Sequence, residues 1–254
     1  MATLALKLTL TPLLIAIASF AQRRWGAALG GLIAGLPLTS APVSVFLAVD
    51  HGSAFAARSA IGMLFGTVAM SAFCAAYVII ARHSAWLLSS VLALAACALA
   101  TFAASLVPQN LALAAAITCP ALLALIAFIG RPAPRAPAVS SPWWDTPARM
   151  VTAAVAVIGI TAVAQFIGPT WSGLLATLPV FACVMGVFSH RRGGYSAAHG
   201  VLRGIAVGAL GAAAFFLVVG SLIRRGPLAV TYASATVAAL AVAGLGHRLF
   251  DAAA

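Results

Sequence analysis

Long apolar runs follow one another along nearly the whole 254-residue chain, and they constrain its fold more than any other feature. A helix needs about 20 apolar residues to cross the hydrocarbon core of a membrane. The runs are continuous and lack the alternation of a transmembrane β-strand. We therefore expect an all-α integral membrane protein with about nine transmembrane helices, at Leu4–Phe20, Ala28–Ala48, Ala54–Ala81, Ala85–Leu106, Leu111–Gly130, Met150–Ile167, Ser172–Phe188, Ser196–Ile223 and Ala229–Leu249.

The composition excludes an ordinary soluble domain, because 64% of the residues are hydrophobic and only 7% are charged. A soluble fold with this composition would have an apolar exterior. The net charge of +11 comes from basic residues placed between the apolar runs, so it favours orientation in a bilayer over binding of nucleic acid. The expected partners are the lipid bilayer and a small-molecule or ion substrate, with a homo-oligomer also possible and no nucleic acid.

A second feature is an internal duplication, in which residues 31–37 (GLIAGLP) recur as residues 173–179 (GLLATLP). The same offset of 142 residues holds without a gap from residue 26 to residue 82. Glycine, proline, phenylalanine and arginine carry this signal, because alanine and leucine agree often by chance in such a sequence. The most informative identical pairs are Gly26/Gly168, Gly31/Gly173, Pro37/Pro179, Phe46/Phe188, Gly52/Gly194, Gly62/Gly204, Gly66/Gly208, Phe73/Phe215 and Arg82/Arg224.

The duplication predicts two repeats of four spans each, separated by one further span. We expect residues 1–130 to hold the first repeat and the connecting fifth span, 131–149 to form a cytoplasmic linker, and 150–254 to form the second repeat. An odd number of spans separates equivalent positions, so the two repeats should insert in opposite directions, as in many secondary transporters. The fold class is therefore two inverted-topology repeats with proline-broken helices.

The basic residues predict the orientation, because cytoplasmic loops are enriched in Lys and Arg. We expect a multi-pass protein of the plasma membrane, specifically a bacterial inner membrane, with the N-terminus outside and the C-terminus in the cytoplasm. The outside segments then hold Lys7, Arg58, Arg224 and Arg225. The inside segments hold Arg23, Arg24, Arg82, Arg131, Arg135, Arg149, Arg191, Arg192, Arg203 and Arg248.

The two equivalent prolines predict a site near the middle of the membrane. Proline removes a backbone N–H and leaves the carbonyl four residues earlier without its helical partner, here at Ile33 and Leu175. Paired helix interruptions are the best sequence indication of a transporter binding site. The predicted substrate-binding residues are Ile33, Pro37, Thr39, Ser40, Ser44, Leu175, Pro179, Ala182 and Gly186.

Two simpler interpretations apply to parts of this region. The prolines could only kink their helices, with the hydroxyls of Thr39, Ser40 and Ser44 bonded to their own backbone. The G-x-x-x-G pairs Gly31/Gly35, Gly62/Gly66 and Gly204/Gly208 are explained by close helix packing, and we assign them no chemistry.

Residues for acid–base or metal chemistry are scarce, so we expect neither an enzyme nor a cofactor. The sequence has no Glu, and Asp50, Asp145 and Asp251 are expected in loops or at the terminus. The histidines are also expected to be peripheral and solvated, the four cysteines to be buried free thiols, and Arg58 and Arg203 to extend to the membrane interface or attract an anion. The histidines are His51, His83, His190, His199 and His247.

The predicted function is a small membrane transporter or exporter of a small neutral or anionic solute, with its site between the two broken helices. The alternative is a non-catalytic accessory or structural membrane subunit, because small-residue stripes suit helix partners. A membrane enzyme is less compatible with the sequence, since the required constellations of acids, bases and metal ligands are absent from it.

Overall fold

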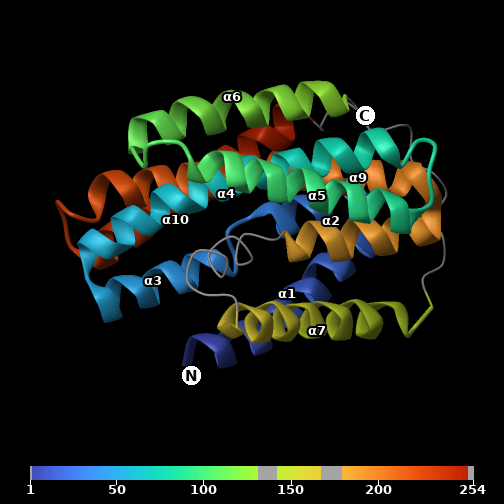
Figure 1. Ribbon diagram of the computed structural model, residues 1–254, viewed down its shortest axis with the longest axis horizontal. Coiled ribbons are helices and arrows are strands. Elements are labelled where there is room, and N and C mark those ends of the chain that lie inside the picture. Colours follow the sequence, from blue (N-terminus) through green and yellow to red (C-terminus); the bar gives the residue numbers. More distant parts are fainter. Residues whose placement is uncertain (1, 131–141, 167–178, 251–254) are drawn as a thin grey trace.

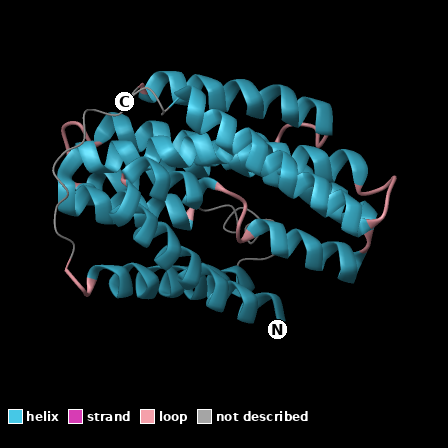
Figure 2. Cartoon of the chain, turned by 180° about the vertical axis from the view of Figure 1, so that it is seen from behind, coloured by secondary structure: helices cyan, strands magenta, loops and turns pink. Residues whose placement is uncertain are grey.

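The computed structural model describes residues 2–130, 142–166 and 179–250. Its elements in these ranges are all helices joined by short loops, as the view from behind shows (Figure 2). Leu175 and most of the linker lie outside the described residues. The helices are α1 (Ala2–Trp25), α2 (Ala27–Gly35), α3 (Ser40–His51), α4 (Ser53–Ile80), α5 (Trp86–Ser105), α6 (Leu111–Ile129), α7 (Asp145–Phe166), α9 (Val180–Leu222) and α10 (Leu228–Phe250).

Six helical segments in the described ranges are long and apolar enough to cross a membrane. The prediction of an all-α multi-pass membrane protein is therefore confirmed, but the predicted number of nine spans is not. The described part of the predicted seventh span and nearly all of the eighth fall in the one long element α9, whose backbone breaks at Gly194 (φ 66°, ψ −163°). The six segments are Ala27–His51, Ser53–Ile80, Trp86–Ser105, Leu111–Ile129, Val180–Leu222 and Leu228–Phe250.

Several helix boundaries are related by the offset seen in the sequence. Adding 142 to the bounds of α4 gives 195–222, which is the part of α9 after Gly194. The same offset takes the first residue of α5 to the first residue of α10. Gly52, which precedes α4, has a φ of 82°, so both equivalent glycines occupy a backbone region that L side chains rarely adopt. The offset therefore relates these backbone features as well as the sequence.

Helices at equivalent sequence positions pack against each other in antiparallel directions. The end of α4 meets the start of the second part of α9, where Arg82 Nε donates to Tyr195 Oη at 3.1 Å. At the opposite end, Arg58 of α4 and Arg224 after α9 line one cavity. Helices α1 and α7 lie side by side at the lower edge in Figure 1, and the last turn of α1 contacts the first turn of α7.

The other helices surround the α4–α9 pair. Helix α5 packs on α4 and α10 packs on α9, while α6 contacts both α4 and α9 along the upper edge of the bundle (Figure 1). Helix α2 contacts α9 and α1, and α3 lies on α4. Two clusters of buried apolar residues fill the interior, one around Tyr77 and Leu202 and the other around Leu64 and Phe215. The core is therefore centred on α4 and α9.

Candidate functional site

The apolar segment Ala27–His51 is interrupted at Pro37. Helix α2 ends at Gly35, Leu36 is extended (φ −65°, ψ 153°), and α3 begins at Ser40. Pro37 is buried and its carbonyl accepts a hydrogen bond from Ala41 N at 2.7 Å. Several consecutive residues leave the helix, so the proline produces a break between two helices and not only a kink.

Close backbone packing holds the end of α2 next to this break. A Cβ atom on Gly31 would collide with the Val201 carbonyl oxygen of α9, and one on Gly208 would collide with the Leu32 carbonyl oxygen. Gly35 and Gly204 are equally crowded by backbone atoms of the facing helix. The predicted packing role of these two glycine pairs is confirmed, and only glycine allows such an approach. Gly62 differs, since a Cβ atom added to it would have no other atom within 4 Å.

The prediction that Pro37 leaves the Ile33 carbonyl without a partner is wrong. Leu36 N donates to Ile33 O at 3.3 Å and to Leu32 O at 3.2 Å, so the helix end caps itself. Such shared bonds are common at helix termini. Pro42 lies in the first turn of α3, where a backbone N–H has no helical acceptor and its loss costs little.

The hydroxyl groups near the break have different surroundings. Ser44 is fully buried, its Oγ lies 2.9 Å from Tyr232 Oη of α10, and its carbonyl accepts from the same tyrosine at 2.8 Å. Thr39 and Ser40 are half-buried, and neither side chain forms a hydrogen bond within the described residues. The interpretation that all three hydroxyls bond to their own backbone is therefore wrong.

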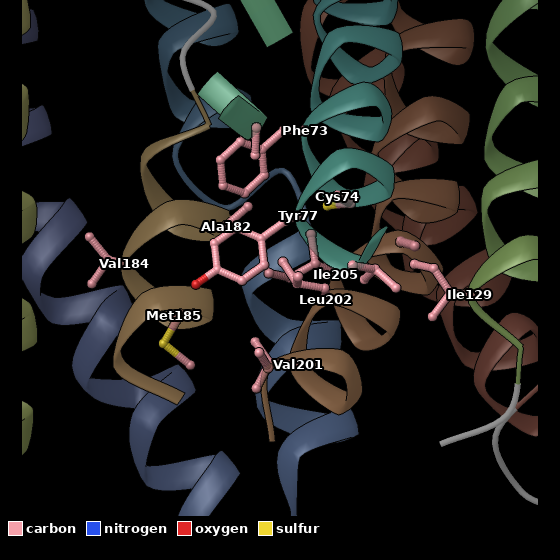
Figure 3. Packing of buried hydrophobic residues seen from close by; sticks show 14 of the residues in the cluster. Phe73, Cys74, Tyr77, Ile129, Ala182, Val184, Met185, Val201, Leu202 and Ile205 are labelled. Atoms are coloured by element: carbon pink, nitrogen blue, oxygen red, sulfur yellow. The ribbon is translucent and has the colours of Figure 1, made fainter. Parts of the chain in front are cut away.

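Pro179 stands immediately before α9, with φ −81° and ψ 67°. It is buried, and its carbonyl accepts from Cys183 N at 2.8 Å. Ala182 belongs to the same buried cluster as Tyr77 (Figure 3), and a Cβ on Gly186 would lie 3.3 Å from Leu202 Cδ2. Ser44 contacts α10 instead of these residues, so the structure does not place it opposite Ala182 and Gly186 as the sequence suggested.

A buried polar network, which the sequence did not reveal, joins α1, α7 and α9 at one end of the bundle. Asp145 has no solvent exposure and forms ion pairs with Arg192 at 2.8 Å, Arg149 at 3.0 Å and Arg23 at 3.4 Å. Its expected place in a loop is wrong, because Asp145 is the first residue of α7, and three guanidinium groups compensate its burial. The i, i+4 spacing of Asp145 and Arg149 was the only local signal for this network.

Gln22 extends the same network through its side-chain amide. Its Oε1 accepts from Arg149 Nη1 at 2.9 Å, and its Nε2 donates to Ser189 Oγ at 2.9 Å. Burial lowers the pKa of the Arg149 guanidinium, while the Asp145 carboxylate acts in the opposite direction. The network therefore fastens the end of α1 and the start of α7 to the first part of α9.

Aromatic side chains and one more guanidinium group lie beside this network. Arg192 stacks over Trp144, with 4.5 Å from Cζ to the ring centroid, and Arg191 stacks over Trp86 at 5.1 Å. A cavity of about 320 Å³ is lined by Trp144, Phe188, Arg191 and Arg192. Stacking of Trp with Arg suits a membrane–water interface, because the indole ring is apolar and the cation stays accessible to water.

Arg203 has a role that differs from both sequence expectations. It is only 3% exposed, and its guanidinium donates to the carbonyls of Ile126, Gly130 and Phe250, at the ends of α6 and α10. A cation at helix C-termini is favourable because the last carbonyls lack helical donors. His199 is also buried and lies 2.8 Å from Ile129 O, so its expected solvated position is wrong.

Comparisons with known proteins return no match among family models, curated proteins or solved structures. Among the described residues, no group of three or more His, Cys, Asp or Glu side chains is arranged to hold a metal ion. The functional interpretation therefore rests on the geometry of this chain.

Proposed function

We propose that this protein is a membrane transporter for a small neutral or anionic solute, built from two inverted-topology repeats. The observation that supports this most strongly is the antiparallel packing of equivalent helices, α4 with the second part of α9 and α1 with α7. A two-fold axis across the helices relates such pairs, whereas parallel repeats would make equivalent helices run in the same direction. Inverted repeats are typical of secondary transporters.

The same geometry supports the proposed orientation. Arg23, Arg82, Arg149 and Arg192 gather at one end through their contacts with Asp145 and Tyr195. Arg203 contacts the last residue of α10, so the end of the described chain lies there too. Under the positive-inside rule this end faces the cytoplasm, and Arg58 and Arg224 face outside.

We place the solute site at the break between α2 and α3, together with Pro179 and its neighbours. A helix break inside a membrane is costly unless protein, water or ligand satisfies its polar groups. The hydroxyls of Thr39 and Ser40, which have no partner among the described residues, are available for that purpose beside the buried Pro37. Ser44 has a supporting role through its contact with Tyr232, while Ala182 and Gly186 lie buried in α9 after Pro179.

The alternative function, an accessory membrane subunit, needs no solute site. Removing the Ser40 hydroxyl should therefore impair a transporter but not an accessory subunit. Purified protein is first screened for solutes that raise its thermal stability, because a ligand that binds only the folded state stabilises it. Each stabilising solute is then tested for flux into proteoliposomes. Ser40→Ala should reduce flux by about two- to tenfold, equivalent to one neutral hydrogen bond.

Ser234→Ala is the matched control, because Ser234 is half-buried like Ser40 and its hydroxyl bonds to carbonyls of its own helix. It should leave flux unchanged. A Pro37→Ala, Pro179→Ala double variant should lose flux, because the backbone at both positions would be free to become helical. Normal flux in this double variant, or flux no greater than in protein-free liposomes for every stabilising solute, contradicts the proposal.

A further inference from the structure

A cavity of about 420 Å³ opens at the end of the bundle opposite the Asp145 network. It lies between the start of α4, the residues after α9 and the turn that joins α5 to α6. Its volume falls within the range of small-molecule sites. The lining residues that matter for the inference are Ala54, Arg58, Gln109, Leu111 and Arg224.

Two arginines share this cavity, and no acidic side chain lines it within the described residues. Among the described residues, neither Arg58 nor Arg224 forms an ion pair, and the ion pairs found there all involve Asp145 at the opposite end of the bundle. Both arginines are exposed, so their charges make the potential at the mouth of this cavity positive, and a small anion would be attracted there.

Membrane orientation does not account for this pair of arginines. Under the proposed topology they belong to the few basic residues on the outside, whereas the positive-inside rule concerns the cytoplasmic end. The backbone adds to the positive field, since the first turn of α4 borders the cavity at Ala54 and no side chain caps this helix. The amide nitrogen of Gln109 is engaged by the carbonyls of Ala104 and Val107 and therefore fixes the neighbouring turn.

We propose that this cavity, which is separate from the solute site at the break between α2 and α3, binds a small oxyanion at the outer end of the bundle. The transported solute would then be a carboxylate or a phosphate compound that enters from this end. The inference rests on the proposed transport function and names its substrate class. Guanidinium groups match the geometry of carboxylate and phosphate, because each can donate two parallel hydrogen bonds to such a group. A neutral solute would form no such charge-assisted hydrogen bonds with the two arginines.

The test measures thermal stabilisation of the full chain in an uncharged detergent. Sodium phosphate and sodium acetate are compared with sodium chloride at equal ionic strength, so that general screening is held constant. At least one oxyanion should stabilise the protein more than chloride does. Arg58→Gln and Arg224→Gln should each weaken its apparent affinity by roughly tenfold or more, as expected for loss of a charged hydrogen bond.

Arg225→Gln is the matched control, because Arg225 is exposed like its neighbour Arg224 but does not line the cavity. It should bind the oxyanion like the natural protein. Arg58→Lys keeps the charge but loses the paired donors, so its affinity should fall between those of the natural protein and Arg58→Gln. The variants should keep the natural thermal stability in chloride, because neither arginine has a partner in the described structure to lose.

Equal stabilisation of all variants, or none of the natural protein, would overturn the inference. Stabilisation by phosphatidylglycerol but not by phosphate or acetate would overturn it too, because the arginines would then bind a lipid headgroup. The two proposals fail separately. Flux of a neutral solute without oxyanion binding refutes the oxyanion site alone, whereas oxyanion binding at this site without flux of any solute refutes transport.

Discussion

At the scale of single residues, burial of polar groups depends on partners that are distant in the sequence. Asp145 is fully buried because Arg23, Arg149 and Arg192 approach it from three helices. A buried charge without partners would cost several kcal/mol. Of these three partners only Arg149 is close to Asp145 in the sequence, so the aspartate was expected in a loop. The contact of Ser44 with Tyr232 was unpredictable for the same reason.

The Asp145 network gives a prediction about stability. Asp145→Asn keeps the side-chain volume but leaves three guanidinium groups without their anion. We expect the free energy of unfolding to fall by about 3–5 kcal/mol, the usual effect of removing one partner from a buried ion pair. Unfolding of the purified protein in detergent measures this change.

Asp50→Asn serves as the control, because Asp50 is exposed and forms no ion pair among the residues that the structure describes. Its effect should stay within about 0.5 kcal/mol. If the two variants lose the same stability, Asp145 does not act as the centre of a buried network.

At the scale of helices, glycine decides how closely two elements approach. The sequence predicted close packing by three G-x-x-x-G pairs, and the structure confirms it for Gly31/Gly35 against Gly204/Gly208. The partner of each pair could not be predicted, because a small-residue stripe does not specify what lies against it. The break at Pro37 was predictable, since proline and its missing N–H act locally. The hydrogen bond from Leu36 N to the Ile33 carbonyl, which caps the end of α2, could not be predicted.

Two glycines related by the offset of 142 should respond oppositely to alanine. Gly204→Ala places a methyl group against the Ala28 carbonyl of α2, so it should destabilise the protein by about 1–3 kcal/mol. Gly62→Ala meets open space in a helix and should stabilise it by up to about 1 kcal/mol. Thermal unfolding of the two variants in the same detergent compares them. Equal shifts in one direction would refute the close α2–α9 contact.

At the scale of the whole molecule, one offset relates features of both the sequence and the structure. The apolar runs predicted the all-α membrane class, and the offset of 142 residues relates the bounds of α4 to those of α9 after Gly194 and the start of α5 to the start of α10. The relative direction of the halves followed only from counting spans. Contacts such as Arg82 with Tyr195 and Arg23 with Asp145 now support it independently. The nature of the solute could not be predicted, because it depends on side chains that meet only after folding.

Opposite insertion of the two repeats is the central claim, and a pair of equivalent positions tests it most directly. Ala54 and Ser196 are both exposed, are related by the offset of 142, and lie at opposite ends of the α4–α9 pair. Cysteine is introduced at each position separately, with the natural protein as the blank for its four existing cysteines. A membrane-impermeant maleimide should label Ala54→Cys in intact cells, and Ser196→Cys only after the membrane is permeabilised. Labelling of both variants from the same side would contradict the inverted repeat and the transport proposal that depends on it.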